Sequence, residues 1–328
     1  MQNKEVYILV TIDTECDKGP GWIIQEPMQF RSVTDSVPDI YSPLFDSFSI
    51  KPTYLLSPEI IANQSCAETL RGTANCELGT HLHGEFIAPQ PQWDANRTKG
   101  IQMDLEADVE KEKLTNLTHL FSETFGYSPK SFRAGRFGMT ERGLGMLQEL
   151  GYTVDSTVSP YKTHYFESGS IRNYWGAPMQ PYFPDAKDIR KKGSMDILQV
   201  PVTIGNPYFE KLPRWLVRTF EDNNKLPKKI LGKLGYRPQI KWLRPHRSTF
   251  EEMRDLCRWV VETHDDHSKP VILNMMFHSN EVLINGSPYV KNKKEQVAYL
   301  DSLKRLFGFL NETYGCKSMG LSEVKAHW

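Results

Sequence analysis

The sequence lacks an excess of charge of either sign, and it lacks any long apolar run. Lys plus Arg and Asp plus Glu each number 40 among 328 residues, so the net charge does not favour binding to nucleic acid or to an anionic membrane. The longest apolar run near the start covers residues 6–10 and is much shorter than a secretory signal, and no later run approaches the roughly 20 residues of a membrane span. We therefore expect a soluble, cytoplasmic protein with no transmembrane segment.

Cysteine is also scarce. The five cysteines are odd in number and widely spaced, which favours free thiols over a disulfide framework or a zinc knuckle. Cys16 lies near the candidate site described below, and we interpret it as a bystander. With 39% hydrophobic residues the chain can bury a substantial core, and we expect one domain over residues 1–328.

Short apolar runs alternate with amphipathic runs along most of the chain. This alternation is typical of βα units and predicts an α/β fold with a parallel sheet or barrel, in which functional residues gather at the carboxyl ends of the strands. The predicted strands cover residues 6–12, 52–56, 77–83, 130–133, 152–154, 197–202, 242–244 and 271–277. Two irregular segments interrupt the pattern. We interpret residues 159–192, which are rich in aromatics, as a rim or lid, and the Lys-rich residues 206–238 as a solvated surface.

Local signals also place helix ends. Asp104 is predicted to cap one helix, and Ser248 is predicted to begin another with Glu251 completing a capping box. A third helix, over residues 294–314, is predicted to turn Val297 toward the core.

Two carboxylates follow the first predicted strand. Because side chains alternate along a strand, Asp13 and Glu15 point to the same side at its carboxyl end, where they would repel each other. A bound cation removes this conflict and lets one carboxylate bind the metal while the other accepts a proton from water. His81 and His83 again share a face at the end of the third strand, and imidazoles are ready ligands of a zinc-like ion.

Two further strand ends carry candidate catalytic groups. Arg133 ends the fourth strand and could form a bidentate ion pair with a carboxylate such as Asp13; an ordinary structural ion pair is the alternative. The glycines on either side of Arg136 can leave backbone amides exposed to stabilise an oxyanion. His278 follows the last long strand, where an imidazole suits general acid catalysis.

The motifs Thr-x-Asp-x-Glu, Gly-Thr-His-Leu-His, Phe-Arg-Ala-Gly-Arg and Met-Phe-His-Ser follow one another between residues 11 and 279. In this order they resemble the polysaccharide deacetylase family, the NodB-homology domain. The resemblance spans most of the chain and implies a distorted (β/α) barrel of about seven or eight parallel strands. It also implies a divalent metal, most simply zinc, and hydrolysis of N-acetyl or other acyl groups on an amino sugar or glycan.

By this resemblance, Asp13 is the general base and Glu15, His81 and His83 bind the metal. The family usually has two adjacent aspartates, and its histidines lie four positions apart, a spacing at which this chain has Glu85; Glu85 is therefore an alternative ligand to His83.

The other roles follow in the same way. Arg133 supports the base, the amide of Arg136 stabilises the oxyanion, and His278 protonates the leaving amine; Asp155 is a looser match for a supporting residue. Tyr289, in a Ser-Pro-Tyr segment, resembles the branch that acts in lipopolysaccharide or exopolysaccharide assembly, and we expect it to bind substrate with Arg136. Two alternatives stay open: an amidohydrolase acting on a small nitrogenous compound, and an inactive glycan-binding or scaffold protein. The sequence does not indicate the oligomeric state.

Overall fold

The computed structural model of the chain describes residues 4–90, 100–206, 240–264 and 266–328. Its main sheet has seven parallel strands in one continuous order, and a short eighth strand, β14 (Lys317–Ser318), pairs with the first half of β1. The seven strands, in spatial order, are β10 (Leu198–Gln199), β5 (Val154–Asp155), β4 (Ser131–Ala134), β3 (Glu77–Leu82), β2 (Pro52–Leu56), β1 (Val6–Thr14) and β13 (Val271–His278). The sheet curls into a half-barrel, as the α/β barrel prediction requires.

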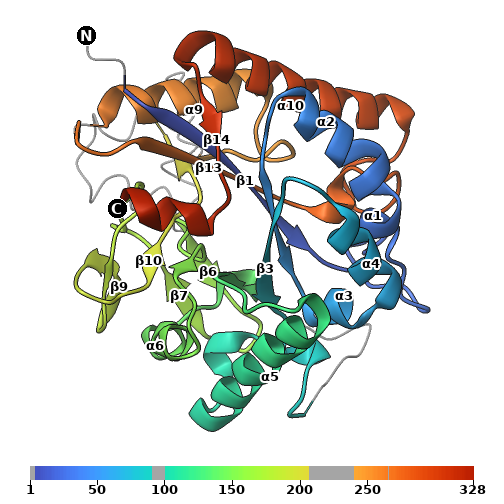
Figure 1. Cartoon of the computed structure of the whole chain (residues 1–328), viewed down its shortest axis with the longest axis vertical. Coiled ribbons are helices and arrows are strands. Elements are labelled where there is room, and N and C mark those ends of the chain that lie inside the picture. Colours follow the sequence, from blue (N-terminus) through green and yellow to red (C-terminus); the bar gives the residue numbers. More distant parts are fainter. Residues whose placement is uncertain (1–3, 91–99, 207–239, 265) are drawn as a thin grey trace.

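Helices lie around the outside of the curled sheet (Figure 1). They are α1 (Arg31–Thr34), α2 (Ser42–Ser47), α3 (Pro58–Ala62), α4 (Gln64–Gly72), α5 (Ala107–Phe125), α6 (Glu141–Glu149), α9 (Phe250–Thr263) and α10 (Lys293–Tyr314). None of the helices in the described part of the chain is both long and apolar enough to cross a membrane.

Strand β1 shows how the sequence builds both sides of the sheet. Its residues 6, 8, 10 and 12 belong to the large outer core against the helices, whereas Tyr7 and Leu9 belong to a second apolar cluster with residues of the C-terminal segment such as Leu321. Thr11 and Asp13 continue the side of Tyr7 and Leu9, because strand side chains alternate. This side of β1 therefore changes from apolar to polar toward the carboxyl end of the strand.

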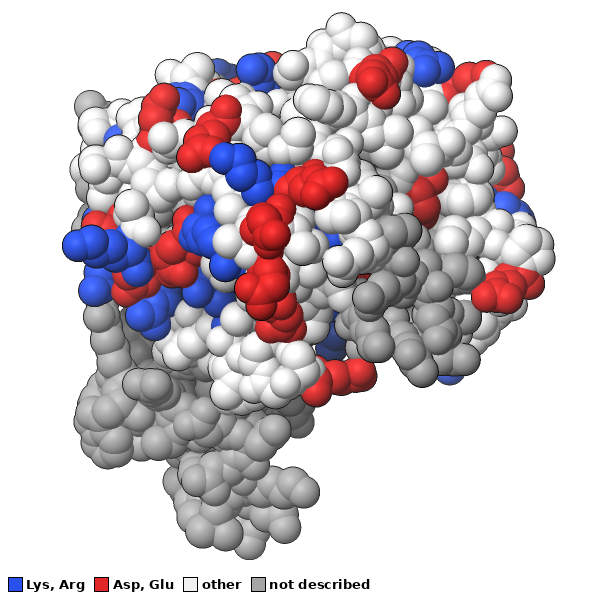
Figure 2. Space-filling model, turned by 90° about the horizontal axis from the view of Figure 1, so that it is seen from below, with Lys and Arg blue, Asp and Glu red and all other residues white. Residues whose placement is uncertain are grey.

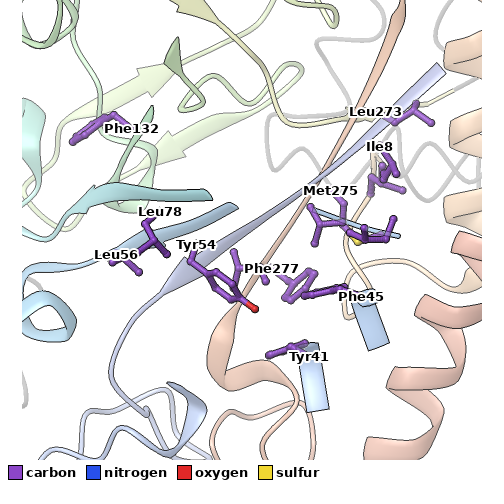
Figure 3. Close-up of a cluster of buried hydrophobic side chains, with 14 of the residues drawn as sticks. Ile8, Tyr41, Phe45, Tyr54, Leu56, Leu78, Phe132, Leu273, Met275 and Phe277 are labelled. Atoms are coloured by element: carbon purple, nitrogen blue, oxygen red, sulfur yellow. The ribbon is translucent and has the colours of Figure 1, made fainter. Parts of the chain in front are cut away.

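The outer core is aromatic where β13 meets the first helices. Figure 3 shows Tyr41 and Phe45 beside Phe277 of β13. The rings of Tyr41 and Phe45 are stacked with centroids 5.7 Å apart, and the Tyr41 and Phe277 centroids are also 5.7 Å apart. Each such fully buried side chain contributes roughly 1.5–3 kcal/mol of hydrophobic stabilisation, which fixes β13 against the helical layer.

Polar groups bridge the gap between β10 and β13, where the sheet does not close. The amide of Thr203 donates to the carbonyl of Asn274 over 2.9 Å, and the amide of Asn274 donates to Thr203 Oγ1 over 2.8 Å. The side chain of Gln180 accepts from the amide of Ile272 and donates to its carbonyl. These bonds satisfy part of the exposed edge of β13 without another strand.

Several local predictions were wrong by small amounts. The capping box of α9 is formed by Thr249 and Glu252, one residue later than predicted from Ser248 and Glu251, because the helix begins at Phe250. Asp104 does not cap α5; it lies in the short turn η3 (Gln102–Asp104) and accepts a hydrogen bond from Ser168.

Two further predictions are corrected by the tertiary structure. Val297 of α10 is 54% exposed, because it lies on the solvent side of the helix. Residues 242–244 do not add a strand to the main sheet: β12 (Lys241–Trp242) pairs antiparallel with β11 (Ile204–Gly205) in a separate ribbon.

The predicted rim segment, residues 159–192, forms two antiparallel hairpins. Their strands are β6 (Thr163–Tyr165), β7 (Ile171–Asn173), β8 (Pro184–Asp185) and β9 (Asp188–Lys192). Of the second irregular segment, residues 206–238, only Asn206 is among the described residues, so the interpretation of its Lys-rich run lies outside them.

Candidate active site

Three predicted metal ligands meet at the carboxyl edge of the sheet. Glu15 follows β1, His81 lies in β3 and His83 follows it; all three are buried, and one ligand atom from each lies within 4.8 Å of the others. Glu15 Oε1 is 3.2 Å from Nε2 of each histidine, and the two Nε2 atoms are 3.2 Å apart. Two imidazole nitrogens and one carboxylate oxygen match the three protein ligands of many catalytic zinc sites, which keep a further position open. The residues present therefore fit a divalent metal.

Each histidine of the cluster is oriented through Nδ1, the ring nitrogen that does not face Glu15. Nδ1 of His81 lies 2.9 Å from the carbonyl oxygen of Arg133, and Nδ1 of His83 lies 3.2 Å from Glu85 Oε1. A carbonyl can only accept, so Nδ1 of His81 carries the proton and Nε2 is left free for a metal. Glu85 accepts from Arg136 over 2.6 Å and stands behind His83. In this arrangement Glu85 contacts His83 and lies outside the cluster of Glu15, His81 and His83.

Lys18 adds a positive charge that the motif pattern did not indicate. Its ammonium group bonds to Glu15 Oε2, the oxygen that does not face the two histidines, and lies 5.1 Å from the centre of the Trp22 ring. Burial alone would raise the pKa of Glu15, but Lys18 and His83 outweigh it and hold the pKa well below its usual value. Glu15 is therefore ionised, with one oxygen held by Lys18 and the other turned toward the histidines.

Arg133 and Asp13 form the predicted ion pair. Arg133 is fully buried, and its Nη1 donates to Asp13 Oδ1 over 2.6 Å. The pair is not bidentate, because Nη2 donates to Thr11 and to Ser156 instead. Burial raises the pKa of Asp13, but neighbouring positive charge, that of Arg133 foremost, outweighs burial and lowers the pKa below its ordinary value. Asp13 is thus a buried, ionised carboxylate whose Oδ2 is 4.0 Å from His81 Nε2.

His278 faces the cluster from the next strand. It is the register partner of Asp13 in the parallel pair of β13 and β1, and its Nε2 lies 3.6 Å from Glu15 Oε1. Its Nδ1 lies 2.9 Å from Glu281 Oε1, and Arg244 bonds to the same carboxylate oxygen. Burial opposes ionisation of Glu281, but Arg244 and His278 lower its pKa to about 2. The imidazole is therefore held by an anion on one side and directed at the candidate metal centre on the other.

The sequence reasoning missed Lys18, Trp22, Arg244 and Glu281. Trp22 packs its ring edge-on to His278 with centroids 5.1 Å apart and adopts a left-handed φ of 58°. Glu281 lies three residues after His278, a spacing that could have suggested a local pair. Nothing in the local sequence indicated that Arg244, 34 residues earlier, would join them.

The two residues expected to bind substrate, Arg136 and Tyr289, have different neighbours in the site. Arg136 has a left-handed φ of 55° in the turn after β4, and Gly135 before it packs so closely that a Cβ there would lie 3.2 Å from His83 Nε2. Tyr289 stacks on His246 with centroids 4.5 Å apart and lies 5.7 Å from the ring of Trp22.

Asp155 and Cys16, the two remaining residues considered from the sequence, are both buried. Asp155 is buried and accepts hydrogen bonds from the amide and the hydroxyl of Thr157, so it supports the loop after β5. Cys16 is a free, buried thiol whose pKa is raised by burial and then by Glu59, which suits a bystander.

Comparison with known proteins yields structural likeness alone. No protein-family model matches the chain, and no curated protein matches its sequence. Its fold is similar to that of the PuuE allantoinase (TM-score 0.53, 13% identity, 99% of this chain and 89% of that chain covered) and of the 4-α-glucanotransferase from Thermococcus litoralis (0.50, 13%, 99% and 41%). A protein from Mycobacterium smegmatis assigned as a polysaccharide deacetylase has a TM-score of 0.49 at 14% identity, with 99% and 91% covered. At such identities the likeness concerns the fold, a curled α/β barrel.

Proposed function

We propose that the chain is a metal-dependent hydrolase that removes an acetyl or other acyl group from the nitrogen of an amino sugar or glycan, in the biosynthesis of cell-surface polysaccharide. The observation that carries the proposal is the arrangement of acidic and histidine side chains at the carboxyl edge of the sheet. The buried cluster of Glu15, His81 and His83 has an ionised carboxylate, Asp13, and an imidazole, His278, beside it. A metal site with a proton acceptor and a proton donor at its edge is what hydrolysis of an amide needs.

Glu15, His81 and His83 would hold the metal, and zinc suits two imidazoles with one carboxylate. Bound zinc would polarise the acyl oxygen and would lower the pKa of a bound water molecule to about 7. Lys18 and Glu85 keep Glu15 and His83 oriented for this task.

Asp13 is the proton acceptor in this mechanism. Arg133 keeps it ionised, so Asp13 can take a proton from the water that adds to the acyl carbon. The backbone amide of Arg136, in the turn beside His83, would donate to the oxygen that becomes negative when water adds. His278, held through Nδ1 by Glu281, would give its proton to the sugar nitrogen as the carbon–nitrogen bond breaks. The products are a carboxylate and a free amine.

The test combines zinc content with acetate release from N-acetylated amino sugars, using the purified full-length protein and a chelator-treated control. We expect about one zinc per chain and acetate release that the chelator abolishes. Asp13→Asn should keep the zinc but lower turnover by about 100-fold to 10,000-fold, whereas Asp301→Asn, an exposed change on α10, should leave both unchanged. Normal turnover by Asp13→Asn would remove Asp13 from the mechanism.

The same site could polarise the carbonyl of a small amide or ureide, and the structural likeness to an allantoinase motivates this second candidate. Zinc binding without acetate release, together with hydrolysis of allantoin, would favour it. The unusual spacing of the acidic and histidine motifs keeps an inactive glycan-binding protein as the third outcome, which the absence of bound zinc together with retained glycan affinity would identify.

A further inference from the structure

A cavity of about 530 Å³ borders the candidate active site. Its volume lies within the range of small-molecule sites, which runs from roughly 300 to 1,000 Å³. The turn after β4, the hairpin strand β6 and the segment that follows β12 contribute its walls. Residues 162–167 of the predicted rim segment are among the lining, so part of this segment does reach a cavity beside the site.

Two arginines connect this cavity to the catalytic groups. Arg136 lines it and bonds to Glu85, which holds His83. Arg244 also lines it and bonds to Glu281, which holds His278. A ligand in the cavity therefore lies against residues that contact both the metal cluster and the proposed proton donor.

The titratable lining is mainly basic. Four of the lining residues are cationic and one is acidic: Arg136, Lys162, Arg244, Arg247 and Glu167. His164 adds no charge at neutral pH, because burial and then Lys162 lower its pKa to about 3. Glu85 pairs with Arg136 and Glu281 pairs with Arg244, so the charges of these two arginines are balanced by buried carboxylates.

Arg247 and Arg244 both keep donors available. The side chain of Arg247 is exposed and makes no hydrogen bond or ion pair with any described residue. All hydrogen bonds of the Arg244 side chain to described residues come from Nη2, and its buried Nε has no partner among them. A buried guanidinium with unused donors is costly unless an acceptor joins it, and anionic oxygens are its strongest acceptors.

Aromatic rings also line the cavity. Phe137 stacks on His164 with centroids 5.0 Å apart and meets Trp242 edge-on at 5.9 Å. Such faces pack against the apolar side of a sugar ring while the polar groups at the rim bind its substituents.

We propose that this cavity binds an acylated amino sugar that carries an anionic group, a phosphate or a carboxylate, with Arg247 and Arg244 recognising the anion. The inference rests on the proposed function, since it assigns the substrate class to the same site. On the face shown in Figure 2, basic and acidic side chains are interspersed over the described surface. The inference concerns the charges of the residues that line the cavity.

The test measures binding by calorimetry, without turnover, at an ionic strength of about 20 mM, where charge pairs are weakly screened. The probes are N-acetylglucosamine, its 1-phosphate and N-acetylmuramic acid, which carries a carboxylate. We expect at least one anionic probe to bind about tenfold or more tightly than the neutral sugar, and Arg247→Gln to reduce that ratio by about fivefold or more. The matched control, Lys304→Gln on the exposed face of α10, also removes one positive charge and should keep the ratio.

The two anionic probes separate the sources of the charge. Tighter binding of the 1-phosphate alone assigns the site to phosphate, and tighter binding of N-acetylmuramic acid alone assigns it to carboxylate. Equal binding of all three sugars, or an unchanged ratio in Arg247→Gln with wild-type thermal stability, would overturn the inference.

A parallel assay of acetate release tests the proposed hydrolase function independently of the anion preference. Acetate release from the neutral sugar with no anion preference would leave the hydrolase standing without this substrate class. Anion preference without acetate release from any probe would leave the binding site standing without the hydrolase.

Discussion

Replacing Arg133 by Met should expose how strongly the barrel depends on its central ion pair. Arg133 is fully buried and holds Asp13, Thr11 and Ser156 through hydrogen bonds of 2.6 to 2.9 Å. Met roughly matches the length of the side chain but leaves the Asp13 carboxylate buried without its charge partner. Removing one partner of a buried ion pair costs about 3–5 kcal/mol, and we expect the free energy of unfolding to fall by this amount at pH 8.

The loss should depend on pH, and its sign follows from the pKa of Asp13. That pKa is lowered in the folded wild type, so the pair stabilises the fold fully above the ordinary pKa of 3.8, and this contribution is lost as pH falls through the lowered folded value. In Arg133→Met, burial raises the pKa of Asp13 without the opposing guanidinium, so the carboxyl group can become neutral as pH falls. The difference between wild type and variant should therefore shrink from pH 8 toward pH 4.

The assay is urea unfolding with a chelator present, because a bound metal would change the apparent stability of each variant by a different amount. Asp13→Asn and the double variant complete the cycle. The coupling between Asp13 and Arg133 should be about 1–3 kcal/mol at pH 8. An equal loss at every pH, or a coupling near zero, would refute the reasoning that charge pairing, and not packing alone, makes Arg133 important.

Three other changes test separate parts of the structure. Glu85→Gln should weaken zinc binding about 10–100-fold in a titration against a competing chelator, because Glu85 orients His83; unchanged affinity would count against this role. Asp155 has its pKa raised from 3.8 to about 6 by burial, so the unpaired charge should lower stability by about 3 kcal/mol as pH rises from 3.8 through 6. Asp155→Asn should remove that slope from thermal unfolding curves, and a slope that persists would assign it to other groups. Gly79→Ala should cost about 1–3 kcal/mol of unfolding free energy in urea, because a methyl group would lie 2.7 Å from the Ser131 carbonyl oxygen. Gly145→Ala, in an open position of α6, should instead stabilise by up to about 1 kcal/mol, and equal effects of the two changes would contradict the packing argument.

Much of the site was predictable because parallel strands bring their carboxyl ends to one edge. Alternation along β1 placed Asp13 and Glu15 on one side, and the same rule paired His81 with His83. The structure adds the register that joins them: Asp13 lies beside His278, and His81 lies beside Arg133.

The predictions that failed depended on which surface a segment meets. The residue pattern of β12 resembles that of any short strand, yet β12 pairs with β11 instead of the barrel. Val297 fits a helical period but lies on the solvent side of α10. Local periodicity does not distinguish these cases, because the partner surfaces lie far away along the chain.

The sequence by itself determined the α/β class, the order of the chemical motifs and the choice of candidate metal ligands, since these depend on short-range alternation and side-chain chemistry. The tertiary structure alone decided that Lys18 holds one oxygen of Glu15, and that Arg244 and Glu281 hold His278. Long charged side chains adopt many rotamers, and a buried charge is stable only where a partner of opposite sign is packed beside it. Such partners are chosen by the path of the folded chain, which brings residues 244 and 278 within 2.9 Å of each other.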